Sequence, residues 1–231
     1  WVGVLAGRAD ASAISDCHVS GRIVTADPVG TGASGNHGIA AAGAVEYLYQ
    51  SAILRTGSAV EINVATTDEI AYVGGLACEV NGSRIEECTN TGGLRGYSTS
   101  GYSYVGGIAA YIKNGSRVIG CRSGGAITSG HPESAVYAAA GGILGQIWYE
   151  KRAEETVSGC TNTGAVTAVA AGGDSYAGGI VGESYQYDPN TWAEETRSTV
   201  TIADNAGTGT VTAAGAAGGI LGWGDAEWKL N

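Results

Sequence analysis

The sequence predicts an all-β fold, a parallel β-helix (β-solenoid) of about six coils with three short strands each, which we expect to be right-handed. Glycine supplies 40 of the 231 residues, and a glycine-rich motif recurs along the whole chain. Charged residues make up only 15%, and Met and Phe are absent, a composition that disfavours a helical bundle. Short strands with one inward apolar face bury a continuous core only when repeat stacks on repeat, which favours a solenoid.

The recurring motif places two glycines between apolar residues. Its clearest form is Val-Gly-Gly-Leu-Ala at residues 73–77. Further copies lie at residues 105–109, 140–144, 177–181 and 217–221, and weaker ones at 3–7 and 39–43. Successive copies are 32 to 40 residues apart, which predicts one repeat domain. Its expected coils are residues 1–37, 38–71, 72–103, 104–138, 139–175 and 176–215, with a partial coil at 216–231.

A second signature follows each glycine motif. In the third unit it consists of Ile85, Cys88, Gly92 and Leu94. The residues in the cysteine place of other units are Cys17, Cys121, Cys160 and Asn205. The second unit offers only a degenerate match, which consists of Gln50, Ile53, Gly57 and Ala59. Each unit therefore has three apolar runs bounded by turn-forming residues, which predicts three strands per coil.

Equivalent strands of successive coils are expected to pair in parallel, about 4.8 Å apart. The alternative is a propeller with one blade per repeat, which needs four strands in about 40 residues. Units of 32 to 36 residues leave little room for a fourth strand. Asn81-Gly-Ser and Asn114-Gly-Ser fall at the same place in adjacent units and predict tight turns at one corner of the solenoid.

The glycine motif, followed by the strand Ser-Gly-Cys160-Thr-Asn-Thr-Gly164-Ala-Val166-Thr, resembles the GLUG repeats of bacterial surface and secreted proteins. These include adhesin-like proteins and the non-catalytic regions of some IgA-specific metallopeptidases. The resemblance extends over essentially all of the chain. It implies a β-solenoid module of an exported bacterial protein, located outside the cell or on its surface, and it implies no catalytic residue.

Four of the five cysteines share one place in the repeat: Cys17, Cys88, Cys121 and Cys160. Stacking would bring the last three to within disulfide range on successive coils. The favoured interpretation is a buried ladder of free thiols that act as small apolar side chains. A disulfide or a zinc site is the alternative, although the chain has no Cys-x-x-Cys pair. We expect no metal and no cofactor.

Two later units carry insertions after the glycine motif that are rich in aromatic and acidic residues. The candidate binding residues in them are Trp148, Tyr149, Glu150, Tyr185, Tyr187, Asp188 and Trp192. Insertions in a solenoid map to one edge, so we expect the two insertions to be neighbouring loops. Aromatic faces beside carboxylates suit a sugar or a cationic peptide. The alternative, which we favour, is that these loops cover the edge of a sheet or pack against a neighbouring domain.

Composition and motifs restrict the function. A net charge of −10 would repel a nucleic acid, and no stretch approaches 18 apolar residues, so we expect neither nucleic-acid binding nor a membrane span. The chain contains no His-Glu-x-x-His motif and no Gly-x-Ser-x-Gly before a helix. We therefore expect a protein that is not an enzyme.

The expected function is a non-enzymatic extracellular module, either an adhesin stalk or a binding scaffold of a larger protein. Its expected ligand is a glycan or a host surface protein. Both ends of the chain fall within a repeat, so we also expect adjacent repeats or domains beyond them. The alternatives are a carbohydrate-active β-helix enzyme (a polysaccharide lyase or hydrolase) and a subunit of a self-assembling filament.

Overall fold

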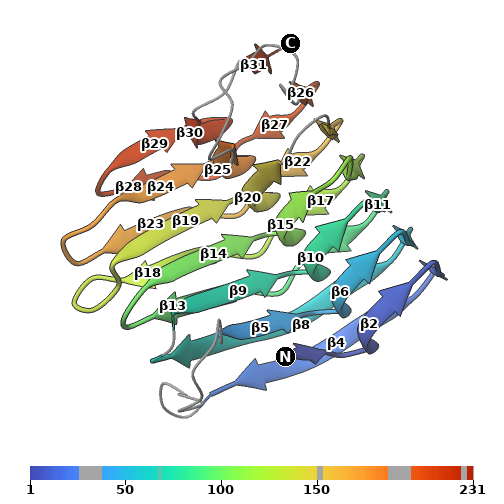
Figure 1. The fold of residues 1–231 in the computed structure, drawn as a ribbon, viewed down its shortest axis with the longest axis horizontal. Helices are drawn as coiled ribbons and strands as arrows, with labels where there is room; N and C mark the ends of the chain where they lie inside the picture. Colours follow the sequence, from blue (N-terminus) through green and yellow to red (C-terminus); the bar gives the residue numbers. More distant parts are fainter. Residues whose placement is uncertain (26–37, 68, 150–152, 187–198, 225–227, 231) are drawn as a thin grey trace.

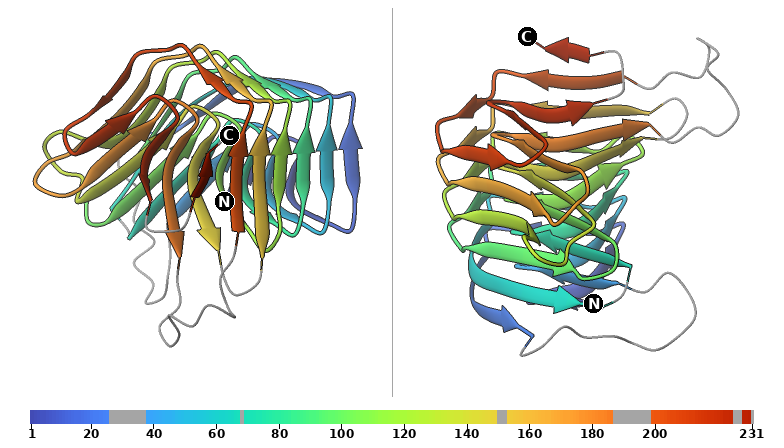
Figure 2. Two further views of the ribbon diagram at one scale, coloured as in Figure 1. Left: turned by 90° about the horizontal axis from the view of Figure 1, so that it is seen from above. Right: turned by 90° about the vertical axis from the view of Figure 1, so that its left-hand side faces the viewer.

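Successive repeats of the chain pair with one another along its whole described length. The computed structural model describes residues 1–25, 38–67, 69–149, 153–186, 199–224 and 228–230. Within these residues every element is a β-strand, and equivalent strands of successive coils pair in parallel. The coils follow one another in sequence order from blue to red (Figures 1 and 2). The predicted parallel β-helix is confirmed.

The strands form four parallel sheets that run the length of the solenoid. Sheet A contains β1 (Val2–Gly3), β5 (Ile39–Ala42), β9 (Ile70–Gly74), β14 (Tyr102–Gly106), β19 (Tyr137–Gly141), β24 (Ser175–Gly178) and β29 (Ala216–Gly218). Sheet B contains β2 (Ala6–Asp10), β6 (Val45–Tyr49), β10 (Ala77–Asn81), β15 (Ala109–Lys113), β20 (Leu144–Tyr149), β25 (Val181–Gln186) and β30 (Leu221–Gly224).

Sheets C and D complete each coil. Sheet C contains β3 (Ala13–Ser15), β7 (Ala52–Leu54), β11 (Arg84–Glu86), β16 (Arg117–Ile119), β21 (Glu154–Ser158), β26 (Thr199–Ala203) and β31 (Trp228–Leu230). Sheet D contains β4 (His18–Val24), β8 (Gly57–Thr66), β12 (Thr89–Asn90), β13 (Leu94–Ser98), β17 (Arg122–Ser123), β18 (Ile127–His131), β22 (Thr161–Asn162), β23 (Val166–Ala170), β27 (Ala206–Gly207) and β28 (Val211–Ala213).

The coils contain more strands than the three predicted. Coil 1 is β1–β4, coil 2 is β5–β8, and coils 3 to 6 are β9–β13, β14–β18, β19–β23 and β24–β28; β29 opens coil 7. The glycine pair divides the first apolar run into a sheet A strand and a sheet B strand. In coils 3 to 6 a further break divides the sheet D strand. In coil 3, the Asn90 side chain bonds both the amide and the carbonyl of Gly92 at this break.

The glycine pair is required by close approach of the backbone, and neither glycine of a pair has a positive φ. A Cβ on Gly106, the first glycine of its pair, would fall on the carbonyl oxygen of Ala109 in the same coil. A Cβ on Gly107, the second, would fall on the carbonyl oxygen of Gly142 in the next coil. The chain can therefore turn sharply from sheet A to sheet B and still stack.

The corner before the cysteine place is a second backbone constraint. One residue in each of coils 1 to 6 has φ between 45° and 63° there. These residues are Asp16, Arg55, Glu87, Gly120, Gly159 and Asp204. A left-handed conformation costs a residue other than glycine about 1–2 kcal/mol, yet four coils accept it, so the stacked coils impose this corner.

In coil 2 the second signature lies three residues later than expected. Ile53 pairs with Ile85 of coil 3, so it takes the first apolar place and not the cysteine place. Thr56 takes the cysteine place, Val60 the glycine place and Ile62 the second apolar place. Glycine is not needed there because β8 runs through this point without a break.

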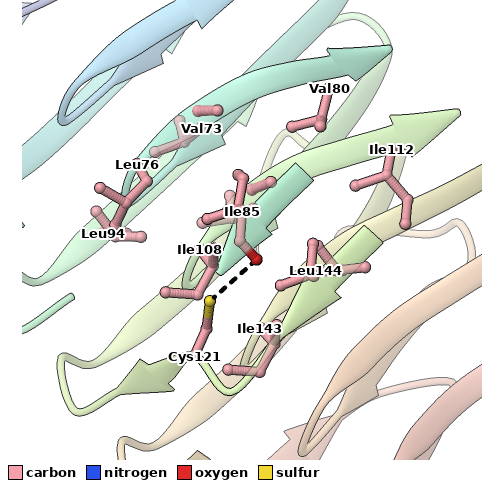
Figure 3. Packing of buried hydrophobic residues seen from close by; sticks show 14 of the residues in the cluster. Val73, Leu76, Val80, Ile85, Leu94, Ile108, Ile112, Cys121, Ile143 and Leu144 are labelled. Atoms are coloured by element: carbon pink, nitrogen blue, oxygen red, sulfur yellow. Dashed lines mark hydrogen bonds between the residues drawn. The ribbon is translucent and has the colours of Figure 1, made fainter. Parts of the chain in front are cut away.

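The core consists of columns of similar apolar side chains from successive coils. Ile53, Ile85, Val118 and Val157 form one such column, and all four are fully buried. Figure 3 shows the interior between coils, where the Cys121 thiol donates to the carbonyl oxygen of Ile85 at 3.5 Å. In the described part of the chain, no helix is long and apolar enough to cross a membrane.

Replacing Gly107 with alanine should destabilise the fold by about 1–3 kcal/mol or more, because the new Cβ would overlap the next coil. Thermal unfolding followed by circular dichroism measures this loss. The matched control is Gly219→Ala, at the same place in a later motif, where a Cβ would meet no atom within 4 Å. Equal losses for the two variants would contradict the close-approach explanation.

Candidate functional site

Three of the predicted aromatic residues of the two insertions lie on strands of sheet B. Trp148 and Tyr149 extend β20, and Tyr185 lies in β25, so the expectation that they form loops is wrong for these three. Side chains continue to alternate between the interior and the outward face in this region: the preceding Ile147 is fully buried, and Trp148 is half-buried. Trp148 pairs in register with Tyr185, and their ring centroids are 5.4 Å apart. Glu150, Tyr187, Asp188 and Trp192 lie outside the described residues.

The four repeat cysteines lie in one column with Thr56 and Asn205. Cys88, Cys121 and Cys160 are fully buried, and Cys17 is partly exposed. All are free thiols, as is Cys78, which lies on sheet B outside this column. The amide of Arg122 donates to the Cys88 carbonyl at 2.8 Å, and the amide of Thr161 donates to the Cys121 carbonyl at 2.9 Å. The neighbouring thiols of Cys160 and Cys88, together with burial, raise the pKa of Cys121. The column is thus part of the apolar core.

Sequence analysis missed a set of tyrosines on the outward faces of sheets A and B. The Tyr72 ring in sheet A stacks on Tyr104 of the next coil with centroids 5.5 Å apart. Tyr72 also meets Tyr111 of sheet B at 5.0 Å, and Tyr176 of sheet A meets Trp223 of sheet B at 5.4 Å. The outward faces of the two sheets therefore meet beside the glycine turn.

We call this surface the aromatic seam. It consists of Tyr72, Tyr104, Tyr111, Tyr137, Tyr176 and Trp223. The signal in the sequence is an outward aromatic residue two to four places from the glycine pair in several units, as in Tyr72-Val-Gly-Gly and Tyr104-Val-Gly-Gly. The alternation of inward and outward residues could not predict that these rings lie against sheet B, because their position depends on the angle of the glycine turn.

Carboxylates lie among the rings of the seam. Glu79 Oε1 forms an ion pair with Lys113 Nζ at 2.7 Å. The same Lys113 Nζ lies 5.6 Å from the centroid of the Tyr111 ring. Glu183 is buried and hydrogen-bonds the hydroxyl of Tyr137. Burial, and then the charge of Glu183, raise the pKa of Tyr137. Hydroxyls and an ammonium group of the chain itself therefore partner these two acids.

A cavity of about 300 Å³ opens at the end of the seam near coil 2. Trp1, Tyr72 and Tyr111 supply aromatic walls, and Glu46 and Glu79 supply carboxylates. Glu46 is half-buried, and it makes no ion pair or hydrogen bond with the described residues. Burial first, and the charge of Glu79 second, raise the pKa of Glu46 to about 7. The cavity combines ring faces with a carboxyl group that has no ion-pair partner among the described residues, an arrangement that suits a hydrogen-bond donor or a cation.

A broader cavity of about 550 Å³ lies at the corner between sheets B and C. At this corner one serine from each of four successive coils is hydrogen-bonded to the next, which forms a ladder. The four are Ser12, Ser51, Ser83 and Ser116. Each hydroxyl of the last three accepts the amide of the serine one coil earlier and donates to a backbone carbonyl. These hydroxyls are therefore engaged within the fold.

Glu155 takes the serine place in coil 5. The register of β16 and β21 sets it beside Ser116, and it is completely buried. Its Oε1 accepts the amide of Gly115 at 2.9 Å, whereas Oε2 has no hydrogen-bond partner in the described part of the chain. Burial, the leading cause, raises the pKa of Glu155 to about 7.

The arrangement favours noncovalent recognition. The described residues contain no group of three or more His, Cys, Asp or Glu that could hold a metal ion. Stacked rings with adjacent hydrogen-bonding groups are typical of binding surfaces for sugars and peptides. Comparisons with protein-family models, with curated protein sequences and with solved structures find no match for this chain.

The Glu155 carboxyl should make stability fall as pH rises. Its pKa is about 7 in the folded chain and about 4.5 when exposed, so the folded state holds the proton more tightly. The loss of stability caused by Glu155 is absent below about pH 4.5, grows between about pH 4.5 and pH 7, and reaches its full size above that. One pKa unit of difference between the folded and the unfolded chain corresponds to about 1.4 kcal/mol of stability. Glu155→Gln should therefore stabilise the chain at pH 8 by roughly 3 kcal/mol. Urea unfolding at pH 4.5, 6 and 8 measures this, and exposed Glu154→Gln is the control. An equal pH slope in both variants would refute the assignment.

Of the five thiols, only that of Cys17 should react readily with a thiol reagent in the folded chain, because the other four are buried. Ellman's reagent should therefore titrate one thiol in buffer and five in denaturant. Cys17→Ser should reduce the native count to none. Rapid reaction of two or more thiols in the folded chain would show that the cysteine column is open.

Proposed function

We propose that this chain is a non-enzymatic repeat module that presents a binding surface outside a bacterial cell, as an adhesin stalk or the scaffold of a larger surface or secreted protein. The observation that carries the proposal is the aromatic seam, to which successive coils add outward rings. A surface built in this way is extended along the solenoid, and it grows with the number of coils. The resemblance to GLUG repeats supports an exported bacterial protein.

The rest of the fold supports a scaffold role. Each coil is joined to the next by backbone hydrogen bonds in all four sheets, for example Ile108 N to Ile143 O at 2.8 Å. The interior is filled by apolar columns. A structure of this kind holds its outward side chains at fixed spacing, so a ligand meets a surface that is already ordered.

The outward face of sheet B extends the surface beyond the seam. Gln146 and Glu183 pair in register, and two residues further on Trp148 pairs with Tyr185. The half-buried rings of Trp148 and Tyr185 offer faces that pack against the apolar faces of sugars, whereas Gln146 and Glu183 are buried and bond within the fold. A glycan, or a host surface protein, is therefore the ligand class that we propose.

One observation favours a second candidate, a hydrolase or lyase that acts on polysaccharides. Glu46 and Glu79 line the same cavity, and the pKa of Glu46 is about 7, within the range of a general acid in glycoside hydrolysis. Glu79, however, is bound to Lys113. Release of reducing ends or of unsaturated sugars from a polysaccharide panel, with loss of that activity in Glu46→Gln, would support the enzyme over the scaffold.

Glycan and host-protein arrays test the binding role. The wild-type chain should give specific hits, and Trp148→Ala combined with Tyr185→Ala should weaken them at least tenfold, because the paired ring faces are removed. Tyr97→Ala is the control: this half-buried ring lies on sheet D, 5.0 Å from that of His131. Absence of hits for the wild type, or equal loss in the control, would contradict the proposal. Circular dichroism confirms that each variant is folded.

A further inference from the structure

We propose that the cavity at coil 2 binds a planar guanidinium group, the arginine side chain of a partner polypeptide. This inference rests on the proposed function, because it assigns ligand chemistry to one end of the presented surface. The cavity is about 300 Å³, and its walls come from sheets A and B. The shape of the cavity follows from a gap in a column of aromatic side chains on sheet A. The size of this gap determines which chemical groups can enter it.

The gap arises from small residues in coil 2. One outward column of sheet A contains, in coil order, Trp1, Ala40, Tyr72, Tyr104, Ala139, Tyr176 and Ala216. In coil 2 this place is Ala40, between Trp1 and Tyr72. Flanking strands two rungs apart are separated by about 9.6 Å. That separation leaves room for one flat group in van der Waals contact with a ring on each side.

The chain itself fills the equivalent gap in coil 5. Ala139 is the small residue there, and the ring of Tyr137 lies 5.9 Å from that of Tyr104 and 5.6 Å from that of Tyr176. Its hydroxyl hydrogen-bonds Glu183 of coil 6. The structure thus shows what this kind of gap accepts: a planar group between two rings, with a donor directed at a carboxylate.

Among the described residues, coil 2 has the same arrangement without a side chain that fills the gap. Register places Gly38 where coil 5 has Tyr137, and Glu79 where coil 6 has Glu183. A Cβ on Gly38 would fall on the carbonyl oxygen of Ile70. No side chain at this position can therefore fill the gap, which the described residues leave open as the cavity.

Charge selects a cation for this gap. Glu46 lines the cavity in coil 2, whereas coil 5 has Gly145 at the equivalent place. Glu79 is neutralised by Lys113, but Glu46 makes no ion pair with the described residues. Burial and the charge of Glu79 raise the pKa of Glu46 to about 7, and the smaller opposing effects of the N-terminal ammonium group and of Arg8 do not offset them.

A guanidinium combines the two requirements. It is flat, stacks on aromatic faces and donates two parallel hydrogen bonds to a carboxylate. Sheet B already contains one such contact, since Arg8 Cζ lies 4.7 Å from the centroid of the Tyr47 ring. A lysine ammonium supplies charge without a flat face, and a tyrosine phenol supplies a flat face without charge.

Titration of the full chain with three small probes, followed by NMR, tests the inference. The probes are the N-acetyl methylamides of arginine, lysine and tyrosine. The arginine probe should bind at least tenfold more tightly than the other two and should lower the pKa of Glu46. Glu46→Gln should weaken arginine binding at least tenfold, and Ala40→Tyr, which fills the gap, should abolish it. Glu61→Gln, an exposed change on sheet D, is the matched control and should bind as the wild type does.

Two results would overturn the inference: no binding of the arginine probe, or binding that Glu46→Gln and Ala40→Tyr both leave unchanged. Preferential binding of the tyrosine probe would also overturn it, because the gap would then select a ring and not a charge. Since Glu46→Gln preserves the shape of the side chain, it keeps the test valid even if Ala40→Tyr disturbs the fold. Array hits without arginine binding would refute this inference alone, whereas arginine binding without array hits would refute the broader proposed function alone.

Discussion

Close stacking of backbone on backbone is the constraint on which the rest of this structure depends. At the glycine pairs of coils 3 to 6, neither residue can carry a Cβ, because the same coil occupies the space beside the first glycine and the next coil the space beside the second. This contact holds sheets A and B at a sharp angle. The sharp angle brings Tyr72 against Tyr111 and so creates the aromatic seam. One requirement of the main chain therefore connects the sequence motif to the surface that we propose as functional.

The repeat period predicted the parallel β-helix and the alignment of the cysteines, because both depend only on which residues recur. It could not predict the number of strands per coil, which depends on where the chain bends. The second coil shows the limit clearly. Val60 stands where other coils have glycine, and only the continuous path of β8 explains why a buried side chain fits there. Likewise, Trp148 belongs to a strand although its neighbourhood in the sequence resembles a loop.

The candidate site was harder to predict than the fold, because it depends on departures from the repeat. The cysteines and the glycines attract attention since they recur, but the cavity exists because Ala40 interrupts an aromatic column and Glu46 replaces a small residue. Each change is unremarkable in one unit of sequence. Their effect appears only when coils are stacked and the rings of neighbouring units come into contact. Glu155 is a similar case, a buried acid in a place that other coils give to serine.

The fixed register also gives the surface a scale of length. The open gap at Ala40 and the filled gap at Ala139 are three coils apart, a separation of about 14 Å at the spacing of parallel strands. An extended peptide advances about 3.3 Å per residue, so one lying along the seam would cover that interval with about four residues. The solenoid therefore sets fixed intervals along its length, and the position of a small residue in the column determines the coil at which a gap between rings can form.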